Sequence, residues 1–286
     1  MTINRRNFFK SLGVAAATLT VGRSIAASPS GDSKTEFQAI LYDSTRCFGC
    51  RACEQACAEA HNLPVPDDDL VAGVIRTPNE KQRSAINIYN TSIGEANIRK
   101  SCMHCNEPAC AAACLTQAMY KTKEGPVIWR GDKCMGCRYC MVSCPFEVPK
   151  FDYNSANPII QKCDLCYDRI IKGEIPACVE ICGEALTFGT RRELIAEARK
   201  RIAESPEGYY PRIYGEDVAG GTGFLILSPV PFEELGLKTN LQKSSYPALT
   251  KGFLYSVPSI FVLLPPLLLG IYEATKKHQS KTEENE

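Results

Sequence analysis

Cysteine is the residue whose number and spacing could do chemistry in this chain of 286 residues, which has sixteen cysteines against three histidines. The cysteines form four motifs, numbered one to four in chain order, that all begin C-x2-C and end C-x3-C. Only the middle gap varies, being two, four, two and eleven residues long. The repeated spacing indicates four copies of one metal-binding unit with loops of different lengths. The motifs are Cys47-Cys50-Cys53-Cys57, Cys102-Cys105-Cys110-Cys114, Cys134-Cys137-Cys140-Cys144 and Cys163-Cys166-Cys178-Cys182.

The spacing favours iron–sulfur clusters over the other uses of cysteine. A C-x2-C-x2-C run presents three thiolates to one [4Fe–4S] cube, and the fourth cysteine ligates the other cluster of a two-cluster ferredoxin. Zinc sites need only two C-x2-C pairs, and c-type haem needs C-x2-C-H, which does not occur in this sequence. Motif three ends in Cys144-Pro145, which completes the bacterial ferredoxin signature, although Ala58, Leu115 and Gly183 replace that proline in the other motifs. Sixteen cysteines therefore predict four [4Fe–4S] clusters.

The segments around the motifs indicate which motifs pair. Residues 118–129, between motifs two and three, have two apolar runs around a glycine-containing turn and predict a hairpin. Strand candidates at 37–42 and 185–189 precede motif one and follow motif four. Motifs two and three would thus form an inner two-cluster unit, inserted into an outer unit made of motifs one and four. The alternative is that motif one pairs with motif two, and motif three with motif four.

With each fourth cysteine crossing to the partner motif, the inserted arrangement predicts four ligand sets, called sets A to D below. In the outer unit, set A is Cys47, Cys50, Cys53 and Cys182, and set B is Cys163, Cys166, Cys178 and Cys57. In the inner unit, set C is Cys102, Cys105, Cys110 and Cys144, and set D is Cys134, Cys137, Cys140 and Cys114.

Both ends of the chain predict targeting segments. The run Asn4-Arg5-Arg6-Asn7-Phe8-Phe9-Lys10 resembles a twin-arginine export signal, and an apolar stretch and a small-residue cleavage site near Ala26 follow it. Because that route carries folded, cofactor-loaded proteins, the thiolates can take up iron before export, which argues against a disulfide framework. Near the other end, the uncharged run 253–272 has the length of a transmembrane helix. Lys276 and Lys277 follow it and favour a cytoplasmic tail.

These features predict an α+β fold with two ferredoxin-like double-[4Fe–4S] units, one inserted in the other, and a single C-terminal transmembrane helix. The predicted segments are a twin-arginine signal peptide at 1–27, the first motif and an insertion of the outer unit at 36–97, the inner unit at 98–158, the fourth motif with its closing strand and helix at 159–240, the transmembrane helix at 253–272 and a disordered cytoplasmic tail at 273–286.

Outside the motifs, the sequence contains no catalytic pattern of the G-x-S-x-G, Walker A or H-E-x-x-H kind. His104 inside motif two is predicted to be solvated rather than to tune the potential of a cluster, and the acidic trio 67–69 is predicted to be a solvated loop rather than a metal site. The run Thr190-Arg191-Arg192-Glu193 predicts a capping box that opens a helix ending near Ala203. A net charge of +1 gives no reason to expect nucleic acid as a partner. The chain is therefore predicted to carry electrons rather than to catalyse a reaction.

The sequence resembles the four-cluster iron–sulfur subunits of the respiratory oxidoreductase superfamily, which serve molybdopterin enzymes such as formate dehydrogenase and some nickel–iron hydrogenases. The resemblance covers about residues 36–237 and is most specific at 41–47, 102–105, 134–153, 177–180 and 188–191. Within that family, having both an export signal and a C-terminal span is similar to the iron–sulfur subunit of the hydrogenase-2 type.

The resemblance implies a non-catalytic subunit on the periplasmic side of the inner membrane, anchored in the lipid bilayer. It would relay electrons between a catalytic subunit, a nickel–iron hydrogenase, and an integral membrane subunit that reacts with quinone. The alternative is the iron–sulfur subunit of a molybdopterin oxidoreductase of the formate dehydrogenase kind. Two other classes stay open, a stand-alone reductase with an open cluster and a structural zinc or disulfide protein of the envelope. Sixteen cysteines fill four clusters without remainder, which argues against the reductase.

Overall fold

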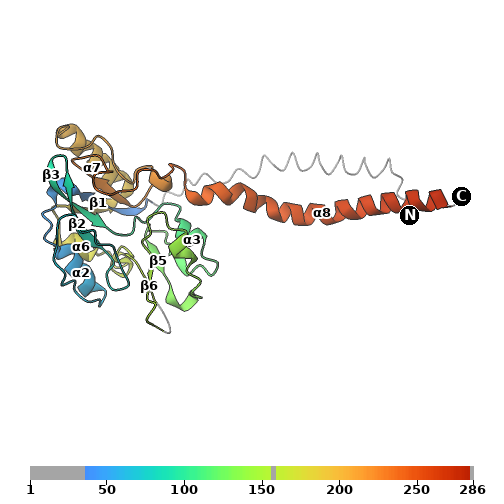
Figure 1. Cartoon of the computed structure of the whole chain (residues 1–286), viewed down its shortest axis with the longest axis horizontal. Helices are drawn as coiled ribbons and strands as arrows, with labels where there is room; N and C mark the ends of the chain where they lie inside the picture. Colours follow the sequence, from blue (N-terminus) through green and yellow to red (C-terminus); the bar gives the residue numbers. More distant parts are fainter. Residues whose placement is uncertain (1–35, 156–158, 284–286) are drawn as a thin grey trace. The chain divides into compact units, whose positions relative to one another are not determined.

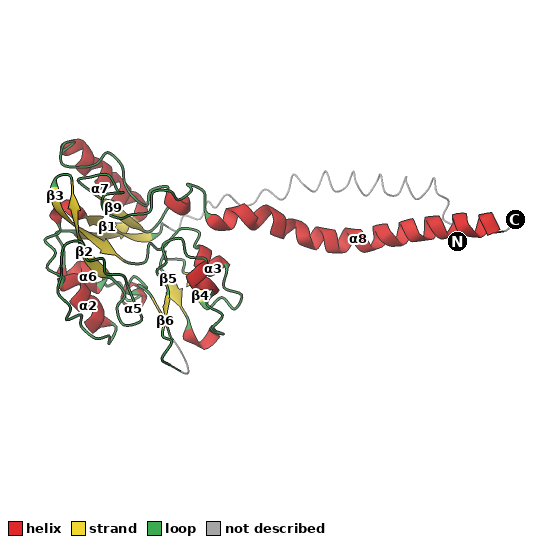
Figure 2. Ribbon diagram, in the orientation of Figure 1, coloured by secondary structure: helices red, strands yellow, loops and turns green. Residues whose placement is uncertain are grey.

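The structure, a computed structural model, describes residues 36–155 and 159–283, so the predicted signal peptide at 1–27 lies outside the described residues. The chain divides into a compact unit, Thr35–Leu249, and a second part that includes the C-terminal residues from Thr250 onward. Figure 1 and Figure 2 show that short strands and mostly short helices are joined by long loops within the compact unit. The described strands are β1 Gln38–Asp43, β2 Ala85–Thr91, β3 Gly94–Lys100, β4 Met119–Lys121, β5 Val127–Trp129, β6 Lys150–Phe151, β7 Ile160–Gln161, β8 Leu186–Thr190 and β9 Phe224–Leu227. The described α-helices are α2 Ala52–Ala60, α3 Ala109–Ala112, α4 Tyr139–Val142, α5 Tyr167–Ile170, α6 Ala177–Ile181, α7 Arg191–Glu204 and α8 Tyr246–Glu283, and the 3-10 helices are η1 Ser44–Arg46, η2 Gly131–Lys133 and η3 Val218–Gly220.

A three-stranded sheet with the order β8-β1-β9 joins the two ends of the cysteine region. β1 pairs antiparallel with β8, with Ile40 opposite Phe188 and Tyr42 opposite Leu186. The strands predicted at 37–42 and 185–189 are therefore present, and they place the segment before motif one beside the segment after motif four. β9 was not predicted from the sequence, and it pairs parallel with β1 on the other side.

A hairpin made of β2 and β3 leads into motif two. The two strands pair antiparallel over their whole length, from Ala85 opposite Lys100 to Thr91 opposite Gly94. The run Ala85 to Tyr89 predicts the first of these strands from the sequence, whereas in β3 charged residues flank the short apolar stretch that contains the buried Ala96 and Ile98. β3 also continues across the expected boundary between residues 97 and 98, so the hairpin connects the two predicted segments.

The hairpin predicted between motifs two and three is present as β4 and β5, which pair with Met119 opposite Trp129. Met119 and Val127 from this hairpin form a small core cluster with Cys110, Phe151 and Ile160. A larger core cluster lies under the β8-β1-β9 sheet and includes Cys53, Cys178 and residues of β2, β3 and β9. Cysteines of the motifs thus belong to both of these cores.

Helix α7 covers the sheet. Its capping box is present as predicted, because the Glu193 N–H donates to Thr190 Oγ1 at 3.4 Å and the Thr190 N–H donates to Glu193 Oε2 at 3.3 Å. The buried Leu194 and Ala198 pack against β1 and β9 side chains such as Leu41. The helix ends at Glu204, one residue beyond the predicted end.

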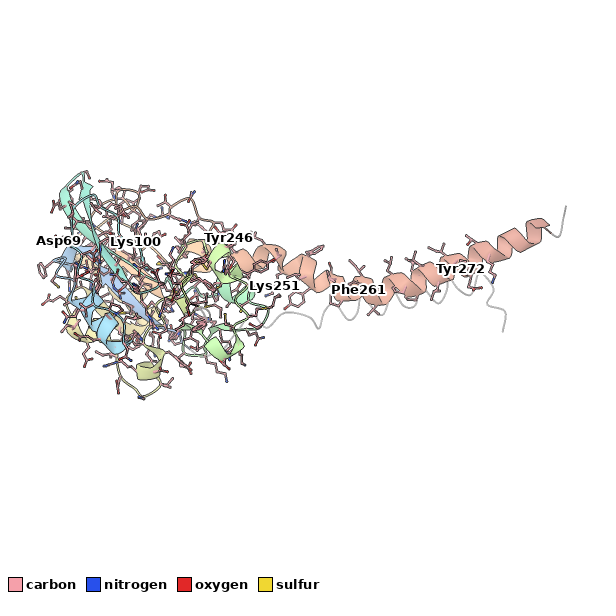
Figure 3. All side chains as sticks on the ribbon, turned by 60° about the horizontal axis from the view of Figure 1, so that its bottom comes forward. Asp69, Lys100, Tyr246, Lys251, Phe261 and Tyr272 are labelled. Atoms are coloured by element: carbon pink, nitrogen blue, oxygen red, sulfur yellow. The ribbon has the colours of Figure 1, made fainter. Side chains whose placement is uncertain are left out.

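Helix α8 contains the predicted transmembrane run and extends past both ends of it. It is 38 residues long, and its segment Tyr246–Glu273 is long and apolar enough to cross a membrane. The apolar side chains of this helix, such as Phe261 and Tyr272, are exposed, and Figure 3 shows them projecting outward from the helix. Residues 273–283, expected to be a disordered tail, continue the helix.

Candidate iron–sulfur site

The residue before the second cysteine has the same uncommon backbone conformation in all four motifs. Its φ is 71° at Gly49, 48° at His104, 73° at Gly136 and 61° at Leu165. Glycine adopts this left-handed region without strain, whereas a residue with a Cβ is strained there. All four motifs therefore begin with the same kind of turn, although only motifs one and three have the glycine that favours it.

The third cysteine of each motif lies on a helix, which fixes where the fourth cysteine can be. These third cysteines are Cys53 on α2, Cys110 on α3, Cys140 on α4 and Cys178 on α6. The fourth cysteine follows four residues later, which is about one helical turn, or roughly 6 Å, further along the axis. This displacement separates the fourth thiol from the other three of its own motif.

The four cysteines of set A line one cavity of about 160 Å³. Burial raises the pKa of Cys47, the Tyr42 hydroxyl lowers it, and the thiols of Cys182 and Cys50 raise it further. Cys182 is thus close enough to the motif one cysteines to act on their charge, although it is far from them in sequence. Cys50 is exposed, whereas Cys53 is buried.

The cysteines of set B are buried together. Burial raises the pKa of Cys57 to about 12, Arg99 lowers it, and Cys178 and Cys166 raise it again. Burial also raises the pKa of Cys163, and Cys57 and Cys178 add to that effect. The fourth cysteine of motif one therefore lies among the cysteines of motif four.

The thiols of motifs two and three are electrostatic neighbours in the same way. Burial raises the pKa of Cys105 to about 12, and the thiols of Cys102 and Cys144 raise it further. Burial raises the pKa of Cys140 to about 11, and the thiols that add to this increase are Cys114, Cys134 and Cys137. In each case the fourth cysteine of one motif is an electrostatic neighbour of the other motif.

The four sets follow one another through the protein interior. Cys53 of set A and Cys178 of set B belong to one core cluster. Cys163 of set B packs with Cys102 of set C around Val148. Cys110 of set C belongs to the cluster that contains the set D cysteines Cys114, Cys134 and Cys140. Two thiols are exposed, Cys50 in set A and Cys137 in set D, whereas every cysteine of sets B and C is buried or half-buried.

The charges around the thiols fit anionic iron–sulfur clusters. Sixteen free thiols are the soft donors that such clusters require. Arg99 is fully buried, and its Nε and Nη2 atoms have no hydrogen-bond partner among the described residues. Burial would lower the pKa of Arg99, but the thiols of Cys178, Cys53 and Cys163 raise it well above its usual range. A buried, unpaired cation among thiols is the charge that an anionic cluster needs nearby.

His104 is not solvated, contrary to the prediction from the sequence. Its exposed fraction is 0 %, and its Nδ1 accepts a hydrogen bond from the Val127 N–H at 3.0 Å. Burial lowers the pKa of His104 well below its usual value, and the nearby Lys162 and Lys121 add to this effect, so the ring is neutral with its proton on Nε2. The prediction failed because the β4–β5 hairpin covers this turn, and local sequence does not reveal that cover.

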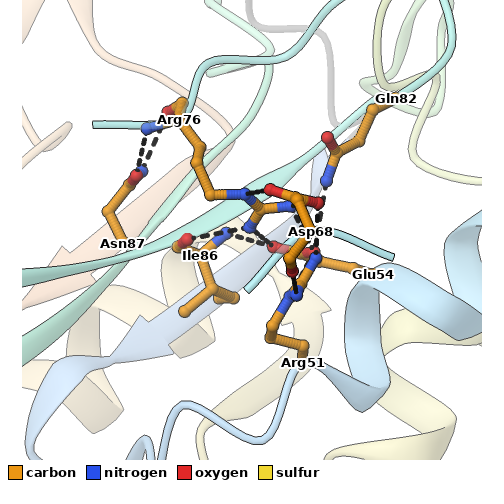
Figure 4. A network of polar contacts seen from close by, with 7 residues as sticks. All are labelled: Arg51, Glu54, Asp68, Arg76, Gln82, Ile86 and Asn87. Carbon is orange, nitrogen blue, oxygen red and sulfur yellow. Dashed lines mark hydrogen bonds and ion pairs between the residues drawn. The ribbon is translucent and has the colours of Figure 1, made fainter. Parts of the chain in front are cut away.

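The acidic trio is likewise more than a solvated loop, because Asp68 takes part in an ion-pair network beside motif one. Arg76 pairs with Asp68 and with Glu54 on α2, and Arg51 pairs with the same two carboxylates, as Figure 4 shows. Hydrogen bonds from Arg76 hold the pKa of Asp68 below its usual value. The Ile86 N–H also donates to Glu54, which links the network to β2.

Comparison with known proteins gives matches over most of the chain. The family model described as a 4Fe-4S dicluster domain matches residues 96–191. A protein of Nitratidesulfovibrio vulgaris is 42% identical over 289 aligned residues, covering 97% of this chain and 78% of that protein. The hydrogenase-2 operon protein HybA of Shigella flexneri is 36% identical over 82% of this chain and 84% of its own length. The formate dehydrogenase-O iron-sulfur subunit of Escherichia coli is 34% identical over 68% of each chain.

Proposed function

The chain belongs to the family of four-cluster iron–sulfur electron-transfer subunits that includes HybA and the formate dehydrogenase iron–sulfur subunits, and on this basis we propose that it conducts electrons between two partner subunits. One partner is a catalytic subunit, a nickel–iron hydrogenase, and the other is an integral membrane subunit that reacts with quinone. The chain itself catalyses no reaction. Its four [4Fe–4S] clusters supply the redox chemistry, and the protein supplies ligands, burial and spacing.

The observation that carries this function is the continuous series of thiol groups from set A to set D. Core contacts join A to B, B to C and C to D. The exposed thiols Cys50 and Cys137 belong to the two end members of the series. A series with buried middle members and exposed ends suits a path that enters at one surface and leaves at another.

The crossed ligand sets and the inserted arrangement of the two units are part of the same proposal. The cavity shared by motif one and Cys182 supports set A, and the neighbours of Cys57 support set B. The pairing of β1 with β8 supports an outer unit that closes around the inner one.

Substitution of single ligands tests this proposal. Cys182→Ala and Cys47→Ala should alter the same cluster signal in electron paramagnetic resonance spectra, because both residues belong to set A. Cys163→Ala and Cys57→Ala should both alter a second, different signal, because both residues belong to set B. Loss of one thiolate leaves a three-cysteine site, so conversion to a three-iron cluster is the expected signature. If Cys182→Ala matches Cys163→Ala instead, each motif holds its own cluster and the crossing is wrong.

Cluster content tests the assignment of the cofactor itself. Sixteen iron and sixteen sulfide per chain are expected, because this is the composition of four [4Fe–4S] cubes. Anaerobically purified protein should therefore be brown and contain iron and sulfide in this amount. Stoichiometric zinc with little iron would contradict the proposal.

We further propose that the chain is exported by the twin-arginine route and anchored at the periplasmic face of the inner membrane. The Arg5-Arg6 pair supports the export step. Arg5→Lys combined with Arg6→Lys should leave cluster-loaded protein in the cytoplasm, because the arginines act as an address and not as part of the fold. Cell fractionation measures this, and normal periplasmic delivery of the variant would contradict it.

Helix α8 supports the anchor, because its segment Tyr246–Glu273 has the length and composition of a membrane span. Truncation before Phe253 should release a soluble, cluster-loaded protein and abolish electron flow to quinone. If the truncated chain alone stays in the membrane fraction, α8 is not the anchor.

A second candidate is service to a molybdopterin enzyme of the formate dehydrogenase kind, which the match to formate dehydrogenase iron–sulfur subunits favours. Purification of the intact complex separates the two candidates, because the large subunit that copurifies will contain nickel in the first case and molybdenum or tungsten in the second.

A further inference from the structure

Arg99 is a buried cation placed between the two sets of the outer unit. It lies on β3, opposite Ile86 of β2, and is among the largest fully buried side chains of the described residues. Its guanidinium carbon lies 5.7 Å from the centroid of the Phe224 ring. Phe224 and Ile86 belong to the core cluster that also contains Cys53 of set A and Cys178 of set B. Arg99 therefore extends into the same core as the thiols of both outer sets.

Arg99 has no carboxylate to balance its charge within residues 36–155 and 159–283. The one hydrogen bond of its side chain in this part of the chain is from Nη1 to Ser101 Oγ, at 3.4 Å. Nε and Nη2 have no partner there. Arg76, the other arginine near motif one with a side chain less than a tenth exposed, pairs with both Glu54 and Asp68.

A lone charge in an apolar core is costly unless an opposite charge lies nearby. The groups that act on Arg99 are thiols from both outer sets, Cys53 from set A and Cys178, Cys163 and Cys57 from set B. The same cation lowers the pKa of Cys53 and of Cys57, although burial raises both to about 12. Among the described residues, thiols of the two outer sets are thus the groups that favour the charged form of Arg99 most strongly.

We infer that Arg99 is a positioning cation shared by the two centres of the outer unit, and that it holds the reduction potentials of both above the values that burial alone would give. This inference depends on the proposed ligation of sets A and B. Reduction of either centre by its neighbour moves one electron and leaves the neighbour oxidised by one electron. Because Arg99 is close to both, its positive charge stabilises the more negative, reduced form of each, and the low dielectric of the core strengthens that effect.

Substitution of Arg99 tests the inference by potentiometric titration of the cluster-loaded, full-length protein, followed by electron paramagnetic resonance. Arg99→Met removes the charge and keeps much of the volume. At a fixed potential, the ratio of reduced to oxidised cluster should fall at least tenfold for both outer centres, which corresponds to about 59 mV for a one-electron couple. The inner centres, sets C and D, should shift much less. The signals are assigned with Cys182→Ala for set A and Cys166→Ala for set B.

Two further variants separate charge from structure. Arg99→Lys keeps the positive charge and should retain most of the wild-type potential of both outer centres. The matched control is Arg76→Gln combined with Asp68→Asn, which removes an arginine together with a carboxylate that pairs with it. At a fixed potential, this control should change the ratio of reduced to oxidised cluster at the outer centres by no more than a few-fold.

The outcomes distinguish failure of this inference from failure of the proposed function. If Arg99→Met keeps sixteen iron and shifts neither outer potential, the inference is wrong and the four-cluster function stands. A shift in only one outer centre would also overturn the shared role. If Arg99→Met fails to load the outer clusters while Arg99→Lys loads them with near-wild-type potentials, the charge is required and the inference holds. If both variants lose the outer clusters, the guanidinium serves folding and the inference is wrong. Wild-type protein without four clusters would overturn both proposals.

Discussion

Motifs one and three have identical cysteine spacing, yet the outer and inner regions surround them in different ways. Arg51 and Arg138 follow the second cysteine in each motif and have almost the same left-handed backbone, with φ of 61° and 63°. Arg51 forms ion pairs with Glu54 and Asp68, whereas Arg138 lies over the rings of Phe151 and Tyr153.

The next helical position differs as well. Glu54 follows the third cysteine of motif one and is buried in the network of Figure 4, whereas Met141 takes that place in motif three and packs against the small inner core. The partners of motif one come from the insertion before β2, which motif three lacks. The repeat thus sets the spacing of the cysteines, while the segments inserted around it determine their burial and the charges near them.

The largest expected contrast is in thiol ionisation, between the fourth cysteines of motifs one and two. Burial raises the pKa of Cys57 to about 12, whereas hydrogen bonds from the Met119 N–H and the Thr116 hydroxyl outweigh burial and lower the pKa of Cys114 below 9.0. At pH 8 the thiolate fraction should then be about one in ten thousand at Cys57 and far higher at Cys114. Iodoacetamide should therefore alkylate Cys114 of folded apo-protein much faster than Cys57.

Mass spectrometry of timed samples measures these rates, and equal rates at the two cysteines would contradict the contrast. The sign of the pH dependence also follows. Because folding raises the pKa of Cys57, its contribution to apo-protein stability is present below pH 9 and is lost as the pH rises toward 12.

The second contrast is in stability at the residue after the third cysteine. Glu54→Met leaves Arg51 and Arg76 without their shared buried carboxylate and should reduce the free energy of unfolding by about 3–5 kcal/mol. Met141→Leu, at the equivalent position of motif three, should cost less than about 1.5 kcal/mol. Anaerobic urea titration followed by cluster absorbance measures both, and a Glu54→Met cost as small as that of Met141→Leu would show that the network contributes little.

The third contrast is at the glycine before the second cysteine. An added Cβ at Gly49 would lie 2.7 Å from Asn97 Oδ1, and Asn97 donates to the Cys47 carbonyl at 2.8 Å, whereas nothing lies within 4 Å of a Cβ at Gly136. Left-handed strain alone should cost Gly136→Ala about 1–2 kcal/mol. Gly49→Ala should cost about 2–3 kcal/mol, because it also disturbs the Asn97 hydrogen bond. Urea titration of the two variants compares them, and a greater loss for Gly136→Ala would reverse the argument.

The smallest contrast concerns the exposed arginine of motif three. Arg138→Gln removes the cation that lies 4.5 Å from the Phe151 centroid and 4.6 Å from the Tyr153 centroid. The expected loss of stability is about 0.5–1 kcal/mol. Arg138→Lys keeps the charge over the rings and should lose less. A loss equal for both variants would assign the effect to the planar guanidinium group rather than to charge.

The sequence by itself was sufficient for the cofactor and for the strands that flank the cysteine region, and it predicts the ligands. The spacing of the first three thiolates of a motif is set by about ten consecutive residues. A local sequence pattern is therefore enough to indicate the type of cluster. The segments of β1, β4, β5 and β8 and the helix opened by Thr190 were predictable for the same reason, because apolar runs, turns and caps are local signals. The crossed sets A–D remain a prediction from that spacing.

Only the tertiary structure decided the surroundings of those ligands. The burial of His104, the pairing of Asp68 with Arg76 and the unpaired position of Arg99 depend on segments that meet only after folding. The local sequence around a histidine or an arginine is the same whether its side chain is exposed or buried. The residues that pack around it in the folded protein determine which of the two occurs. The physical reason is that charge and burial arise from contacts between residues far apart in the chain, such as Arg99 and Phe224, and no local pattern encodes them.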